Sequence, residues 1–162
     1  MTSPPAPASS APVPPPARLS TGARAAAAAL LAGLLAGFAL ARSLTPSEAG
    51  LGTHQQLGLP PCTMRVLTGL PCPACGMTTS FAHFTRGQWG GSLSANSGGF
   101  VLALLCLGLI PVLAWAALTG RLAFPPPGRR DGVASRPEWW GVMGLSLVGA
   151  VTLIDWAFRL AE

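Results

Sequence analysis

The sequence predicts an all-α membrane protein with about three transmembrane helices and a short interfacial helix after a CPxCG turn. Half of the 162 residues are apolar and only 9% are charged, whereas about 25% of the residues in a soluble domain are charged. Three predominantly apolar stretches are long enough to cross a bilayer, and a cysteine-bearing segment separates the first from the second. A soluble fold this poor in charge would struggle to cover its surface, so the apolar residues are expected to face lipid.

Residues 1–23 are expected to form a disordered leader rich in proline and alanine. Seven prolines lie among its alanines and serines. Such a segment can neither form a regular set of backbone hydrogen bonds nor bury a core. The leader therefore contributes no element to the predicted fold.

The first transmembrane helix is predicted over residues 24–42. Its seventeen uncharged residues would span ~26 Å at a rise of 1.5 Å per residue. Gly33 and Gly37 form a GxxxG pair, which lets another helix approach closely, so a membrane-protein partner or a second copy is expected there. The sequence Ala39-Leu40-Ala41 also fits a signal-peptide cleavage site, but the long leader and the following Arg42 favour a retained span.

The second transmembrane helix is predicted over residues 98–119, and the third over residues 139–158. Their lengths correspond to ~33 Å and ~30 Å, enough to cross the hydrocarbon layer. Pro111 is expected to kink the second helix, at a cost that neighbouring helices can absorb. In the third helix Asp155 precedes Arg159 by four residues, which predicts a local ion pair near the helix end. Interfacial anchors are expected at both of its ends, from Trp139, Trp140 and Trp156.

The arginines predict the orientation of the chain. The leader is basic, and the proline- and arginine-rich connection over residues 120–138 carries four arginines. Positive charge marks cytoplasmic segments, so the N-terminus and this connection are expected in the cytoplasm. The loop over residues 43–97 then faces outward. Because the arginines lie beside apolar runs and form no patch, we expect the lipid bilayer as a partner and no nucleic acid.

The outward loop contains the residues with the clearest chemistry. The run Cys72-Pro73-Ala74-Cys75-Gly76 predicts a turn, since Pro73 fixes the backbone between the two thiols. An apolar stripe follows at helical spacing and predicts a short helix over residues 77–86, with Gly87 just past its end. Cys75, Thr79 and His83 share a second face of this helix. The apolar stripe consists of Met77, Phe81 and Phe84.

The run LTGLPCPACGMTTSF, with Cys62 ten residues before Cys72, resembles the signature of the DUF2752 family of small bacterial multi-pass membrane proteins. The family pattern is a tG-x-pCP-x-CG-x-T loop that follows one span and precedes others. The resemblance covers residues 59–120 and implies location in a bacterial inner membrane. It implies no activity, because the family's function is unknown. This chain has Thr79 where many members have arginine, and Asn96-Ser97 where many have Asn-Pro.

Three kinds of chemistry are open to the cysteine loop. Cys62 could bridge to Cys72 or Cys75 as a structural disulfide in an oxidising compartment. Alternatively, the three thiolates could bind zinc or copper, with His83 or His54 as a fourth ligand. The third possibility is a membrane thiol–disulfide oxidoreductase that uses Cys72 and Cys75.

A structural or metal-binding loop that works beside a partner is the favoured function. The sequence has no phosphate-binding glycine loop, no HExxH motif and no paired carboxylates, and its five acidic residues are widely spread. These absences favour a non-enzymatic role. Cys106, inside the second predicted span, is expected to be a packing residue.

Overall fold

The structure is a computed structural model that describes residues 18–121 and 137–161. Most of the predicted leader, most of the predicted cytoplasmic connection, and the side chains of Trp139 and Trp140 lie outside the described part. The described elements follow one another as α1 (Thr21–Ser43), the 3-10 helix η1 (Thr53–Leu57), α2 (Thr63–Thr68), α3 (Met77–Phe84), α4 (Trp89–Ala95), α5 (Ser97–Thr119) and α6 (Pro137–Ala161).

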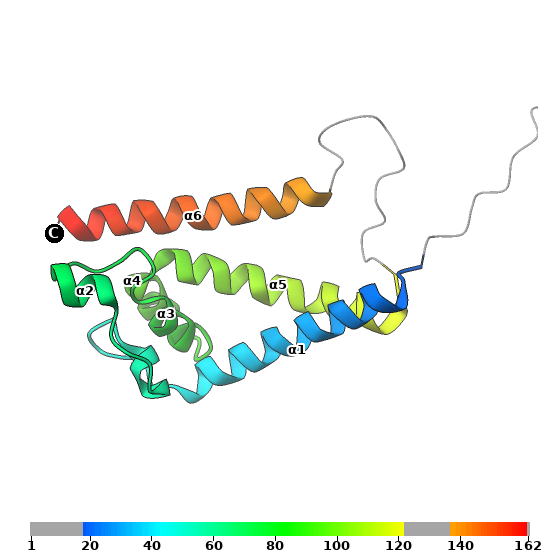
Figure 1. Ribbon diagram of the computed structural model, residues 1–162, viewed down its shortest axis with the longest axis horizontal. Helices are drawn as coiled ribbons and strands as arrows, with labels where there is room; N and C mark the ends of the chain where they lie inside the picture. The colour runs from blue at the N-terminus through cyan, green and yellow to red at the C-terminus, as the bar shows by residue number, and fades with distance from the viewer. Residues whose placement is uncertain (1–17, 122–136, 162) are drawn as a thin grey trace, which may run out of the picture.

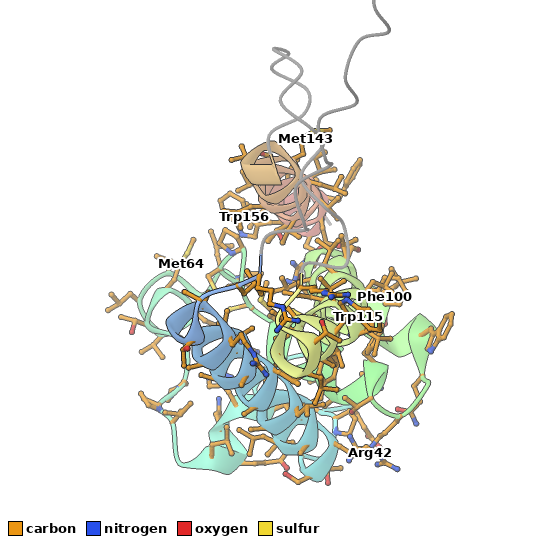
Figure 2. All side chains as sticks on the ribbon, turned by 90° about the vertical axis from the view of Figure 1, so that its right-hand side faces the viewer. Arg42, Met64, Phe100, Trp115, Met143 and Trp156 are labelled. Atoms are coloured by element: carbon orange, nitrogen blue, oxygen red, sulfur yellow. The ribbon has the colours of Figure 1, made fainter. Side chains whose placement is uncertain are left out.

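Within the described part, α1, α5 and α6 are the helices long and apolar enough to cross a membrane. This confirms the predicted class, an all-α membrane protein. The helix α5 lies between α1 and α6 and contacts both (Figures 1 and 2). Each helix starts one to three residues before its predicted span. Large apolar side chains point outward, as Figure 2 shows for Met143 on α6, and small residues such as Ala103 are buried between helices.

The N-terminal end of α1 is bonded to the C-terminal end of α5. The guanidinium of Arg24 donates to the carbonyl oxygen of Ala117 at 3.0 Å, and the N–H of Leu19 donates to the carbonyl oxygen of Gly120 at 2.8 Å. Arg24 therefore satisfies carbonyls that the end of α5 leaves free. The two helices run in opposite directions, as Figure 1 shows, which is the arrangement expected for consecutive spans.

Residues 44–96 form what we call the cap, which gathers at the opposite end of the helices (Figure 1). The sequence predicts one short helix here, whereas the structure has η1, α2, α3 and α4. The additional elements are five to seven residues long, too short to show a helical period. The predicted helix begins at Met77 as expected and ends at Phe84, two residues early, and Gly87 follows in the left-handed region with φ 73°.

The helix α3 is inserted between the ends of α1 and α5. Its apolar stripe meets α1 where the ring of Phe38 lies 6.0 Å from Phe81 and 6.3 Å from Phe84. On the other side, Phe84 and Phe100 of α5 make an edge-to-face pair at 5.7 Å. Such pairs fix helix positions beyond what apolar burial alone achieves. The cap is thereby anchored in the helices that it covers.

Candidate metal centre

Three free cysteines come together in the cap. The Sγ atoms of Cys62, Cys72 and Cys75 all lie within 4.8 Å of one another. Cys72 and Cys75 belong to the CPxCG turn, and Cys62 precedes the first residue of α2. The short helix α2 turns the chain back, so a cysteine ten residues upstream reaches the turn.

Backbone hydrogen bonds shape the CPxCG turn around its sulfur atoms. The N–H of Cys75 donates to the carbonyl oxygen of Cys72 at 3.0 Å, which closes the turn. The N–H of Cys72 donates to the Sγ of Cys75 at 3.2 Å, and the two Sγ atoms are 2.9 Å apart. Gly76 follows with φ 89°, and a Cβ there would collide with the carbonyl oxygen of Ala95. Only glycine fits this position.

The thiols differ in their electrostatic surroundings. The backbone N–H of Arg65, followed by the thiols of Cys75 and Cys72, lowers the pKa of Cys62 to about 7. Burial, followed by the neighbouring Cys72, raises the pKa of Cys75 to about 12. Cys62 is therefore readily ionised, whereas an ionised Cys75 needs a nearby positive charge to stabilise it.

The cysteines line a hollow of about 410 Å³ that opens to the surface of the cap. Within residues 18–121 and 137–161, no acidic side chain contributes to its lining. Arg65 and His54 are the lining residues that can carry positive charge. The three cysteine sulfurs and the imidazole of His54 in this lining are the kinds of ligand that zinc and copper prefer.

The side chain of Asn96 holds the CPxCG turn through hydrogen bonds. It is fully buried, and its Nδ2 donates to the carbonyl oxygens of Pro73 at 3.0 Å and Cys75 at 3.1 Å. Its Oδ1 accepts from the N–H of Gly99 at 2.7 Å, so Asn96 also caps the N-terminus of α5. Sequence reasoning missed this residue, although an asparagine just before a long apolar run is a helix N-cap signal.

The helix α6 holds the same turn from the other side. Trp156 Nε1 donates to the carbonyl oxygen of Pro71 at 2.6 Å, and Arg159 Nη1 donates to that of Cys75 at 3.1 Å. The predicted ion pair between Asp155 and Arg159 is confirmed at 2.5 Å. Asp155 also accepts from the hydroxyl of Ser97 at 2.7 Å. Residues far from the cysteines in sequence therefore fix the turn in place.

Residues 62–110 match the family model described as "Protein of unknown function (DUF2752)". This confirms the resemblance drawn from the CPxCG run. The DUF2752 segment contains all three clustered cysteines, the helices α3 and α4, and the first part of α5. No curated protein and no solved structure matches the chain.

The two histidines considered as fourth ligands lie in different surroundings. His83, inside the DUF2752 segment, is not brought into the thiol cluster. Its Nδ1 is 2.7 Å from the side-chain oxygen of Gln88, and its ring lies against Gly91 of α4. His54, which precedes the segment, is not part of the thiol cluster either, but it lines the same hollow as the three cysteines. Cys106 lies on α5 and is not part of the cluster.

Proposed function

We propose that this chain is an integral membrane protein whose cap binds one soft metal ion through Cys62, Cys72 and Cys75. The observation that carries the proposal is the convergence of three free Sγ atoms within 4.8 Å, contributed by two separate segments. Thiolates favour zinc and copper(I) over hard cations such as magnesium. The backbone N–H that points at Cys75 Sγ would stabilise a thiolate ligand in addition.

The metal ion would act as a structural cross-link in the cap. It would join the start of α2 to the CPxCG turn, and the turn is already bonded to α5 and α6 through Asn96 and Trp156. An ion that binds only the folded state stabilises that state in proportion to its affinity and free concentration. The arginine distribution supports a cytoplasmic N-terminus and an outward cap. The family resemblance supports a bacterial inner membrane as the location.

The test is metal analysis of protein purified in detergent from cells supplied with zinc or copper. We expect one metal ion per chain in the wild type. Cys62→Ser, Cys72→Ser and Cys75→Ser should each lose it, whereas Cys106→Ser, the matched control, should retain it. A wild-type protein that binds neither metal, and whose unfolding temperature a chelator leaves unchanged, would overturn the proposal.

A second candidate function follows from the 2.9 Å contact between the sulfur atoms of Cys72 and Cys75. This pair could form a disulfide and pass two electrons and two protons to a quinone or to the disulfide of another protein. Thiol trapping in membranes, with and without a quinone, distinguishes the two functions. Cycling of this pair should survive Cys62→Ser, whereas metal binding should not.

We also propose that α1 associates with a second copy or with a partner membrane protein through Gly33 and Gly37. A Cβ added at either glycine meets no atom within 4 Å, so this face of α1 is open. Small residues on an open face allow close helix approach in lipid.

A further inference from the structure

We propose that His54 is the fourth ligand, which closes a tetrahedral site of three thiolates and one imidazole and selects zinc over copper(I). The inference rests on the proposed metal-binding function and names the ligand and metal that complete it. It replaces His83, the histidine that the sequence spacing favours, with a residue outside the DUF2752 segment.

His54 is brought to the cysteine hollow by its buried neighbour. The hydroxyl oxygens of Thr53 and Thr79 are 2.8 Å apart, and both side chains are fully buried. Thr79 follows Cys75 by four residues on the adjoining helix α3. The N–H of Ser47 donates to Thr53 Oγ1 at 3.0 Å. The first bond ties η1 to α3, and the second ties η1 to the loop before it. His54 is the next residue along η1.

Two glycines confine η1 to a single short turn beside the hollow. Gly52 and Gly58 flank it with φ 89° and 75°, conformations that other residues rarely adopt. The N–H of Gly58 donates to the carbonyl oxygen of Gln55 at 2.9 Å and closes the turn. The backbone that carries His54 is therefore held at both ends.

The ring of His54 is bonded as a metal-ligating imidazole usually is. Its Nε2 lies 3.2 Å from the carbonyl oxygen of Pro60, which can only accept a hydrogen bond, so Nε2 carries the proton. The lone pair of the neutral ring then lies on Nδ1. Metal-ligating histidines typically donate their other ring N–H to a carbonyl or carboxylate, which fixes the tautomer.

The number of ligands decides between the two metals. Three thiolates alone suit copper(I), whereas three thiolates with one imidazole form the four-ligand tetrahedral set of structural zinc sites. Zinc bound to three thiolates and a neutral imidazole leaves one net negative charge, which Arg65 in the same lining can offset. A site with four protein ligands has no open position, which agrees with a structural role.

The experiment compares His54→Ala and His54→Gln with His83→Ala in the full-length protein, in detergent. X-ray absorption of the zinc-loaded wild type should show three sulfur ligands and one imidazole. Both His54 variants should lose the imidazole scattering. Their zinc affinity should fall by at least about 10–100-fold, which is the loss typical when a residue that hydrogen-bonds to a metal ligand is mutated. His83→Ala should bind zinc as the wild type does.

The outcomes separate this inference from the proposed function. If the His54 variants keep the imidazole signal and full affinity, His54 is not a ligand and the inference is overturned, while the trithiolate site stands. If His83→Ala alone loses the signal, the inference is also overturned. A wild type that binds copper(I) but no zinc overturns the inference alone, and one that binds neither metal overturns both. Helical circular dichroism of each variant, with His54→Gln as the less disruptive change, separates ligand loss from unfolding.

Discussion

The cap and the membrane-spanning helices differ in the side chains that they bury most completely. Among the described residues, the largest fully buried side chains are all polar and all belong to the cap: Asn96, Thr53, Thr79, Ser80 and Ser92. In α1 and α5 the buried residues are alanine and glycine, while leucines face outward. A water-soluble protein has the reverse arrangement, with leucines buried and polar side chains exposed. In lipid, leucine gains nothing by moving inside, so small residues fill helix contacts and polar groups find partners within the protein.

The difference shows that specificity is concentrated in the cap. Ser80 and Ser92 join α3 to α4 through hydroxyl groups 2.9 Å apart, and Ser80 Oγ donates to the carbonyl oxygen of Asn96 at 3.1 Å. Directional bonds of this kind permit one arrangement and are costly to leave unmade when buried. The contacts between spans are less directional. Substitutions in the cap should therefore cost more than substitutions in the spans.

Gly76→Ala should have the largest effect. The change combines a strained left-handed backbone with a collision against the carbonyl oxygen of Ala95, together about 4 kcal/mol of unfolding free energy. Gly87→Ala is the matched control, because it has φ 73° but no atom within 4 Å of the added Cβ. It should cost only about 1 kcal/mol. Unfolding in mixed detergent measures both, and equal losses would show that the collision has no consequence.

Asn96→Ala should follow, at about 3 kcal/mol. It removes a helix N-cap and leaves the carbonyl oxygens of Pro73, half-buried, and Cys75, buried, with fewer donors. Asn96→Ser retains a good cap for α5 but loses the bonds to the CPxCG turn, so it should recover about 1 kcal/mol of this loss. Both variants should bind metal more weakly, as measured by competition with a chromophoric chelator. Wild-type metal affinity in both would contradict the proposed role of Asn96 in positioning the turn.

The spans, the start of α3 and the ion pair between Asp155 and Arg159 could be predicted from sequence because each depends on local spacing. The length of an apolar run predicts a span directly, and the apolar stripe from Met77 to Phe84 predicts a helix face. The pairing of Cys72 with Cys75 is local too. These predictions needed no knowledge of which segments meet.

The parts that could not be predicted depend on contacts between distant segments. Asn96 reaches the turn from more than twenty residues away, and Trp156 from 85 residues away. Cys62 joins the cluster only because α2 folds, and six residues carry too little periodicity to reveal that helix. Likewise, His83 had the favoured spacing along a helix. Tertiary structure instead places His54 in the lining of the hollow that the three cysteines share.

Trp156→Phe tests the attachment of a span to the cap and should cost about 1 kcal/mol. The change keeps an aromatic ring but removes the bond from Nε1 to the carbonyl oxygen of Pro71. Trp115→Phe is the control in α5. The indole of Trp115 is half exposed, and its N–H makes no hydrogen bond in the described structure. It should leave unfolding unchanged. An equal effect of the two substitutions would indicate that ring size, rather than the hydrogen bond, determines the stability.

Gly33→Leu and Gly37→Leu should have the smallest effect on folding, and a clear one on association. Neither added side chain meets a neighbour at its Cβ, so the free energy of unfolding should change by less than about 1 kcal/mol. If the open face of α1 is an interface between copies, the bulkier residues should lower resonance energy transfer between labelled chains in vesicles.

Gly108→Leu is the matched control, because that glycine of α5 is equally open. Unchanged transfer in all three variants would remove the reason for assigning a partner to α1. A loss of energy transfer in the α1 variants alone would show that the small residues of α1 serve contacts between chains. The glycines of the cap, in contrast, serve the fold of a single chain.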